Sequence, residues 1–344
     1  MGWKDELLEL TRVRVLLFLR EPEAIFWVFV FPIILAAILG LAFRSRPVDR
    51  LPVAVVAGPH AEARMAILSR GLELEPRVLP EADARQALAR GHVVLVVSGG
   101  DSPAYSYDPT QPESRAARLI VDGALQREAG RKDAFTPQQV ELTEPGARYV
   151  DFLVPGLLGM NLMGTGMWGI GFSLVVARNG NLLKRLIAAP ARRSHLLGAQ
   201  LASRLLFLIP EAGALLLFAY FVLDVPLRGS ILLLVGVSLL GALAFSGLGL
   251  LTAARPRTIE GVSGLMNLVM VPMWIFSGIF FSTERFPEGM QPFVQALPLT
   301  ALNDALRGVM LEGTGLAALV PELAILAVWG AVSFVLALKL FRWQ

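Results

Sequence analysis

The sequence contains no cysteine and little charge. Without cysteine there are neither disulfides nor cysteine-ligated metal sites. Asp, Glu, Lys and Arg make up 17% of its 344 residues, whereas an average soluble domain has about 25%. The three histidines, His60, His92 and His195, lie far apart and lack the spacing of metal ligands. We therefore predict no metal site on this chain.

Three common motifs of enzymes are also missing. There is no G-x-x-x-x-G-K-[ST] loop for nucleotide phosphates, no G-x-S-x-G nucleophile elbow and no H-E-x-x-H zinc motif. No apolar segment carries a pair of carboxylates. We therefore expect no catalytic site and no cofactor on this chain.

Long apolar runs are what the sequence has in abundance. Hydrophobic residues make up 55% of it and the mean hydropathy is +0.60, which excludes a disordered protein, a coiled coil and an ordinary cytosolic enzyme. A helix that crosses a hydrocarbon core of about 30 Å needs about 20 mostly apolar residues. The segments that satisfy this requirement are 24–43, 152–177, 205–223, 230–254, 262–281 and 319–338. The sequence thus predicts six transmembrane helices.

Basic residues near the ends of these segments are unevenly distributed. One side of the membrane has 14 of them, namely Lys4, Arg12, Arg14, Arg20, Arg178, Lys184, Arg185, Arg192, Arg193, Arg204, Arg255, Arg257, Lys339 and Arg342. The short loops on the other side have 3, namely Arg228, Arg285 and Arg307. Because cytoplasmic loops are rich in Lys and Arg, we predict a multi-pass protein of the inner (cytoplasmic) membrane with both termini in the cytoplasm. The net charge of +3 reflects this clustering, and we expect no nucleic-acid partner.

Residues 44–151 differ from the rest because they hold 14 of the 31 basic and 15 of the 28 acidic residues. Apolar, valine-rich runs at 51–57 and 92–98 predict two buried strands. Further strands are predicted at 76–79 and around Tyr105 and Tyr107, and helices at 60–72, 80–91 and 112–130. We interpret 44–151 as a small extracytoplasmic α/β domain inserted between the first two spans. Gly99-Gly100 lacks the G-x-G-x-x-G spacing of a phosphate loop and is interpreted as a turn.

Residues 1–23 precede the first apolar run. Within them Trp3, Leu7 and Leu10 share one face of a helix, and the charged residues lie on the others. This pattern predicts an amphipathic helix in the cytoplasmic membrane interface. A mobile tail is the alternative.

The cytoplasmic segment 178–204 contains a second amphipathic helix. Its apolar face is formed by Leu182, Leu183, Leu186 and Ile187, whereas Lys184 and Arg185 lie off that face and Pro190 ends the helix. One interpretation is a docking helix that couples the membrane segments to a cytoplasmic partner. The other is a basic helix that rests on lipid headgroups, and composition favours neither.

A few polar residues inside the apolar segments are candidates for a substrate pathway. Glu211 follows Pro210 in the third span, and a charge at the centre of a span costs about 2.5–3.5 kcal/mol. Asn161 and Trp168 lie in the glycine-rich second span, and Asn267 lies in the fifth. The alternatives are a carboxyl bonded to a neighbouring helix for Glu211 and ordinary helix packing for the others.

Residues 282–310 are too polar and too rich in proline to cross a membrane as one helix. Pro287, Pro292 and Pro298 divide them into pieces. We expect short outer-leaflet or re-entrant helices here.

The order of these parts resembles the permease subunit of ABC-2-type (type V) exporters. The N-terminal helix runs through REPEAIFWVFVFPIIL to a proline within the first span, Pro32. The cytoplasmic segment reads GNLLKRLIAAPARRSHLLGAQL, which is similar to the family's pattern of a glycine, a basic-apolar helix, a proline and the entry to the third span. Near the end, the family's S-G pair and its LP-L-T and D-A-L-R-G runs correspond to Ser277, Gly278, Pro298, Leu299, Thr300, Asp304, Ala305, Leu306, Arg307 and Gly308. In one departure, Arg178-Asn179 stands where the family often has an acidic residue before the glycine.

The resemblance implies a membrane all-α fold with six spans, the interfacial helix and the inserted α/β domain. It also implies that two permease subunits pair, that separate ATPase subunits hold ATP and Mg²⁺, and that a hydrophobic or amphipathic substrate leaves the cytoplasm or the inner leaflet. Two rival functions are a secondary transporter and a membrane protein whose α/β domain senses a ligand or binds an envelope partner. The secondary transporter is disfavoured because the spans show no clear inverted repeat and only one mid-span ionisable residue.

Overall fold

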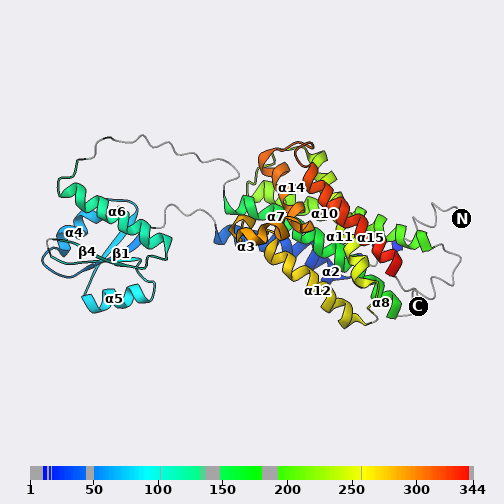
Figure 1. Ribbon diagram of the computed structural model, residues 1–344, viewed down its shortest axis with the longest axis horizontal. Coiled ribbons are helices and arrows are strands. Elements are labelled where there is room, and N and C mark those ends of the chain that lie inside the picture. Colours follow the sequence, from blue (N-terminus) through cyan, green and yellow to red (C-terminus); the bar gives the residue numbers. More distant parts are fainter. Residues whose placement is uncertain are drawn as a thin grey trace. The chain divides into compact units, whose positions relative to one another are not determined.

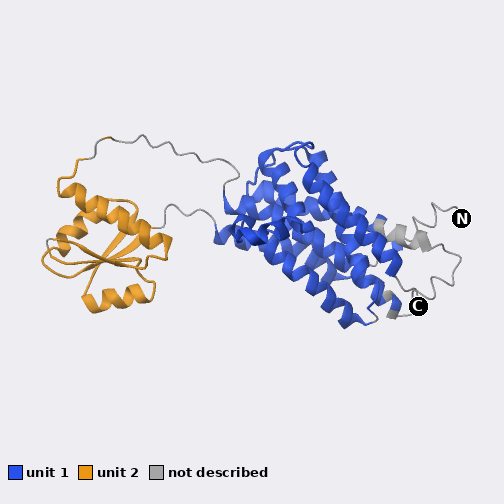
Figure 2. Ribbon diagram, viewed as in Figure 1, with its two compact units in different colours: residues 1–44, 143–344 blue, residues 45–142 orange. Residues whose placement is uncertain are grey.

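The computed structural model describes residues 11–13, 15–16, 18–43, 50–100, 102–132, 135, 148–179, 193–256 and 258–340. The chain forms two compact units, one of residues 1–44 and 143–344 and the other of residues 45–142 (Figure 2). We call them the membrane unit and the α/β unit. The segment 182–187 and most of the predicted interfacial helix lie outside the described residues.

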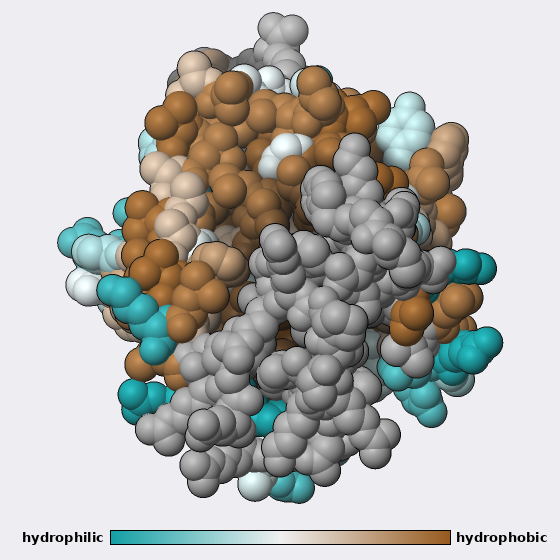
Figure 3. Space-filling model, turned by 90° about the vertical axis from the view of Figure 1, so that its right-hand side faces the viewer, coloured by the Kyte–Doolittle hydropathy of each residue, from teal (hydrophilic) through white to brown (hydrophobic). Residues whose placement is uncertain are grey.

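The membrane unit consists of helices (Figure 1). The long ones are α2–η1–α3 (Pro22–Ile25, Phe26–Val30 and Phe31–Ala42), α7–η2–α8 (Tyr149–Gly166, Met167–Phe172 and Ser173–Asn179), α10 (Arg193–Val222), α11 (Ile231–Ala253), α12 (Ile259–Phe276) and α15 (Val320–Leu340). Five are long and apolar enough to cross a membrane, namely Pro22–Ala42, Ala202–Val222, Ile231–Ala253, Ile259–Phe276 and Val320–Leu340. Most of their outward side chains are apolar, and hydrophobic residues cover the upper part of the face in Figure 3.

The predicted second span is helical but is not among those five. Glycines and Asn161 lower the hydropathy of α7 and η2, and most of α7 is buried against other helices of the unit. Its environment is therefore mainly protein. The count of six spans stays a prediction.

Helix α7 begins at Tyr149, inside the range that the sequence analysis assigned to the soluble domain. Asp151 is fully buried and accepts hydrogen bonds from the Arg148 backbone N–H at 3.1 Å and from the Arg148 guanidinium at 2.7 Å. The same guanidinium donates to the carbonyl of Asp224, just after α10, at 2.7 Å. The charged residues thus start the helix and fasten it to α10, so their polarity does not mark a soluble segment.

The segment 282–310 folds as short helices, as predicted. They are η3 (Thr283–Arg285), η4 (Glu288–Met290), α13 (Gln291–Gln295) and α14 (Pro298–Arg307), followed by η5 (Gly308–Glu312). Helix α14 is buried along most of its length and packs against α7, α11 and α15. Its position in the membrane stays a prediction.

The α/β unit contains one four-stranded sheet in the order β2-β1-β3-β4. The strands are β1 (Leu51–Val56), β2 (Leu74–Leu79), β3 (Leu95–Ser98) and β4 (Ala104–Tyr107), and the helices are α4 (Ala61–Leu68), α5 (Glu81–Ala89) and α6 (Pro112–Glu128). Strand β1 pairs in parallel with β2 and β3, whereas β4 is antiparallel to β3. Helix α5 covers one face of the sheet, and α4 and α6 cover the other (Figure 1). These elements confirm the predicted strands and helices of this region.

The Gly99-Gly100 segment is a turn, as predicted. Gly99 has φ +89°, which favours glycine. Arg64, 7% exposed, donates to the carbonyls of Ser98 at 3.2 Å, Gly99 at 2.7 Å and Gly100. Across the same face, Tyr105 donates to Asp122, and burial with this bond raises the pKa of Tyr105 to about 12.

Glycines allow α11 and the second span to touch along their backbones. A Cβ on Gly249 of α11 would lie 2.9 Å from the Cα of Met167. A valine there must push the helices apart, and such overpacking costs about 1–3 kcal/mol. We expect Gly249→Val to lower the midpoint of thermal unfolding in detergent by roughly 2–10 °C.

Gly236 provides the control, since it lies on the same helix and its Cβ would have no neighbour within 4 Å. Gly236→Val should leave the midpoint nearly unchanged. Equal losses for both variants would mean that the helix propensity of valine, and not the contact with Met167, sets the cost.

Candidate functional site

A buried ion pair lies inside the third predicted span. Arg204 and Glu211 are seven residues apart on α10, which places them on one face about two turns apart. Their guanidinium and carboxylate form a direct ion pair. Arg204 is 7% exposed and Glu211 is 1% exposed. Helix α10 therefore carries its own counter-charge into the apolar interior.

Thr165 of α7 joins this pair to the second span. Its Oγ1 lies 2.9 Å from Glu211 Oε1, and the Arg204 guanidinium donates to the same hydroxyl oxygen. Glu211 therefore has Arg204 on one carboxylate oxygen and Thr165 on the other. Burying a charge is tolerable only when it is paired and hydrogen-bonded, and both conditions hold here.

One turn earlier on α7, Asn161 reaches the first span. Its Nδ2 donates to the carbonyl of Val28 at 3.0 Å. Pro32 has no N–H to offer the carbonyl four residues before it, which is that of Val28. The helix around Val28 is also widened into the π-helical turn η1. The Asn161 amide thus serves a backbone acceptor that proline deprives of its usual donor.

We call Val28, Asn161, Thr165, Arg204 and Glu211 together the polar bridge. Thr165 Oγ1 also lies 2.8 Å from the backbone carbonyl of Asn161, so the two halves of the bridge meet on α7. The bridge connects α10, α7 and the first span by polar contacts in an otherwise apolar environment. It holds no unoccupied carboxylate oxygen, which makes proton transfer or metal binding there a poor fit.

The structure gives Arg204 a different environment from the one that the sequence analysis assigned to it. The sequence analysis placed it in the cytoplasmic segment 178–204, whereas the structure places it in the helix Ala202–Val222, buried beside Glu211. Removing it from the basic residues of the cytoplasmic side leaves 13 of the 14, so the asymmetry persists. Opposite charges seven residues apart at the start of an apolar run are the signal that could have identified the pair.

The other candidate residues lie apart from this pair. Trp168 is half-buried on η2, with its ring centroid 5.3 Å from that of Phe172. Asn267 is exposed on α12. Of the hydrogen bonds among the described residues, none joins Trp168 or Asn267 to the polar bridge. The structure therefore brings together Asn161 and Glu211 only.

The family motif near the end of the chain forms a structural clamp. Arg307 donates to the carbonyl of Gly278 and lies over the ring of Phe152, 3.8 Å from its centroid. Asn303 donates to the carbonyl of Ser277 at 2.8 Å. Through these contacts helix α14 is fixed to the turn after α12 and to helix α7 of the predicted second span. The sequence analysis missed Asn303 and Phe152, because an asparagine or phenylalanine has no distinctive pattern there.

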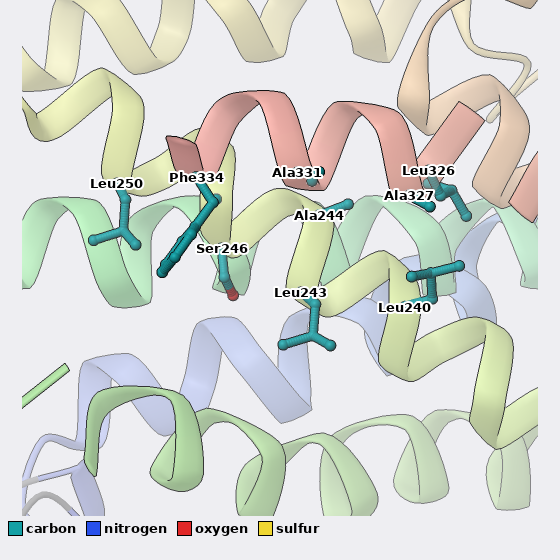
Figure 4. Close-up of a pocket in the computed structure, with 11 residues that line it drawn as sticks. Leu240, Leu243, Ala244, Ser246, Leu250, Leu326, Ala327, Ala331 and Phe334 are labelled. Atoms are coloured by element: carbon teal, nitrogen blue, oxygen red, sulfur yellow. The ribbon is translucent and has the colours of Figure 1, made fainter. Parts of the chain in front are cut away.

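An apolar cavity of about 340 Å³ lies between α11 and α15 (Figure 4). It is lined by Leu240, Leu243, Ala244, Ser246, Gly247, Leu250, Leu326, Ala327, Gly330, Ala331 and Phe334. The Ser246 hydroxyl donates within its own helix, to Ala242 at 2.6 Å. The cavity therefore offers apolar contact and no reactive group. Across the described part of the chain, no cluster of metal-ligating residues occurs.

Comparison with known proteins places the chain among transporters. It matches the family described as "ABC-2 family transporter protein" over residues 22–339. It is 30% identical over 174 residues to ABC transporter G family member 20 of Dictyostelium discoideum. The matched region covers 50% of this chain and 24% of that protein. It is 26% identical over 174 residues to the inner membrane transport permease YhhJ of Escherichia coli, and 25% identical over 176 residues to the linearmycin resistance permease protein LnrN of Bacillus subtilis. These matches cover 50% and 51% of this chain and 46% of each permease.

Matched regions thus span less than half of each of these relatives. The family match is far longer and runs through both the first and the last predicted spans. Two of these relatives are named as permeases. The family match, together with the five apolar helices, shows that this multi-pass membrane protein belongs to the ABC-2 family of transporter proteins.

Proposed function

We propose that the chain is the permease subunit of an ATP-driven exporter. The observation that carries the proposal is the family match over residues 22–339, on a unit built from apolar helices. The sequence has no phosphate-binding loop of the Walker type. A separate ATPase subunit would therefore hold ATP and Mg²⁺, and this chain would supply the path through the membrane.

Two further partners belong to the proposal. Residues 182–187 would dock the ATPase, since the helical spacing of their leucines and isoleucine predicts one apolar face. A second copy of the permease would cover Asn267, because α12 presents this amide on its surface within a membrane-crossing helix. An amide left in lipid is unfavourable, whereas a hydrogen bond between helices stabilises their association. The substrate route would then run along the interface between the two copies.

The substrate class in the proposal is hydrophobic or amphipathic. The relatives include a linearmycin resistance permease and a probable multidrug permease, YbhS of Escherichia coli. In this chain the outward faces are apolar, with Ile209 70% and Leu268 69% exposed. A molecule that partitions into the bilayer could reach such faces directly.

The experiment is co-purification of the tagged permease with candidate ABC ATPase subunits of the same cell. We expect a complex of two permease and two ATPase subunits that hydrolyses ATP in proteoliposomes, with hydrolysis lost when the Walker lysine of the ATPase is replaced. A permease that purifies alone and leaves ATP turnover of the ATPase unchanged would contradict the proposal. In inside-out vesicles the cytoplasmic face is outward, so ATP-dependent accumulation of a lipophilic dye inside these vesicles then tests the direction of export.

The proposed orientation places the α/β unit outside and both termini in the cytoplasm, from the uneven basic residues. The chain has no cysteine, so a single introduced cysteine is labelled without background from native thiols. The two positions are Ser69, exposed on the α/β unit, and Ser194. We expect an impermeant maleimide to label Ser69→Cys in intact spheroplasts and Ser194→Cys only after permeabilisation. The reverse pattern would invert the orientation.

A further inference from the structure

We infer that the polar bridge is a mechanical junction that makes the first and third spans move together with α7. The inference rests on the proposed function in one respect, namely that movement enters the permease from an ATPase. The bridge itself consists of contacts within this chain. Its junction role can therefore be measured whether or not an ATPase binds.

The first span is only partly buried in the membrane unit. Along Phe31–Ala42 its buried residues are Pro32, Ala36 and Gly40, spaced by four residues. Ile33, Leu35 and Leu39 are partly buried and pack against the core of the unit. Ile38 and Leu41 face away from it and are 58% and 69% exposed.

The bond from Asn161 to Val28 adds a specific polar contact to this partial packing. Among the described residues it is the one side-chain hydrogen bond between the first span and another helix. It holds the span at η1, where the helix is widened and a proline follows. A helix that is packed on one side and held by one polar contact is suited to move as a unit with the helix that holds it.

Helix α7 places the two ties at neighbouring levels. Asn161 and Thr165 are four residues apart, so about 6 Å of helix separates the tie to the first span from the tie to α10. Helix α7 is buried on most sides by the membrane unit. Helix α7 is therefore the common element to which the first span and α10 are both hydrogen-bonded.

A direct role for Glu211 in substrate binding fits these contacts less well. Its side chain is fully buried, and both of its oxygens are bonded within the protein. Buried ion pairs contribute little net stability compared with apolar residues of the same size, but they can specify one arrangement of helices. Fixing the relative position of three helices is the use that matches this pair.

The position of α10 connects the bridge to the proposed ATPase contact. Helix α10 begins at Arg193, directly after the segment that holds the proposed docking residues 182–187. A movement imposed on that segment enters α10 first. Through Arg204 and Glu211 it then reaches Thr165, and through α7 it reaches the first span.

The test measures the distance between the first span and α10. Spin labels are attached to Trp27→Cys and Ile209→Cys, both exposed on the outer surface at 59% and 70%, in a chain that has no other cysteine. Pulsed electron paramagnetic resonance in nanodiscs gives the distance distribution. Thr165→Val removes the hydroxyl with little change in shape, and Asn161→Leu removes the amide that holds Val28.

The control is Thr252→Val. Thr252 is a buried threonine, 5% exposed, whereas Thr165 is half-buried, and the Thr252 hydroxyl donates within its own helix, to Gly249 at 2.9 Å, with no hydrogen bond to another helix among the described residues. We expect a single narrow distance distribution for the labelled protein without further substitution and for the labelled Thr252→Val control. For Thr165→Val and for Asn161→Leu we expect a second, longer distance whose ratio to the first rises about 3- to 20-fold, as expected for the loss of one hydrogen bond between membrane helices.

Distributions identical to the control in both variants would overturn the inference. If either variant fails to fold, the pair Arg204→Met and Glu211→Met, which removes both charges, should show the same second distance, and an unchanged distribution there counts equally against it. Adding the ATPase with ATP and vanadate separates the two proposals. No binding of the ATPase refutes the proposed function alone, whereas an unchanged Thr165→Val distribution refutes the junction alone.

Discussion

Replacing Glu211 with leucine is expected to prevent this protein from accumulating in folded form. The substitution leaves Arg204, 7% exposed, as an unpaired charge inside the membrane unit. Removing one partner of a buried ion pair costs about 3–5 kcal/mol, which is a large part of the roughly 5–15 kcal/mol that stabilises a typical protein. Fluorescence-detected size-exclusion chromatography of a tagged protein measures the folded fraction. We expect the monodisperse peak to fall at least tenfold.

Two comparison variants separate the charge from the shape of the side chain. Glu211→Leu combined with Arg204→Met removes both charges, and we expect it to recover most of the folded protein. Glu211→Gln keeps hydrogen-bond partners for Arg204 and Thr165, so its loss should be intermediate. A single leucine variant that folds as well as the double variant would show that Arg204 reaches water or lipid headgroups and does not need Glu211.

The α/β unit could be predicted from local patterns because its signals are local. The apolar run at 51–57 contains β1, which is buried between two neighbouring strands. Helix α5 begins directly after Pro80, and Gly91 follows its end with φ +72°. Proline and glycine act on the chain where they stand, so the boundaries could be found without knowing the tertiary fold.

The polar bridge could be predicted only in part, because its partners are distant in sequence. Glu211 stands out as a carboxyl in an apolar run, but the tie from Thr165 crosses 46 residues and that from Asn161 crosses 133. An arginine at the end of an apolar run has the same pattern whether it meets headgroups or a buried carboxylate. The spacing of Arg204 and Glu211 indicates that the two can pair, but whether the pair is buried depends on where α7 packs, which no local pattern contains.

The glycines of the second span show the same division. Their number indicates close helix packing, but not which helices approach. In the structure a Cβ on Gly166 would lie 2.9 Å from Phe245 Cβ, and one on Gly156 would lie 2.7 Å from the carbonyl of Ile279. Gly166 therefore packs against α11 and Gly156 against the turn after α12. Only the tertiary fold determines which element each glycine contacts.

Replacing Leu183 and Leu186 together with aspartate is expected to release the ATPase from the permease. An exporter without its own nucleotide site must receive force through a cytoplasmic contact, and 178–204 is the longest cytoplasmic segment predicted between spans. Burying one leucine at an interface contributes about 1.5–3 kcal/mol. Losing two, and adding two carboxylates that must be desolvated, should weaken the association at least tenfold.

The measurement is the dissociation constant of the purified ATPase for the permease in nanodiscs. Leu72→Asp with Leu119→Asp is the matched control, since both leucines are exposed on the α/β unit, at 78% and 62%. In the proposed orientation they face away from the ATPase, so the same chemical change should leave its affinity unaltered. We expect the double variant to insert into the membrane and to pair as before, because Leu183 and Leu186 lie outside the predicted spans. If the double variant binds the ATPase as tightly as the control does, Leu182–Ile187 is a basic helix on the headgroups, and the force must enter through another part of the chain.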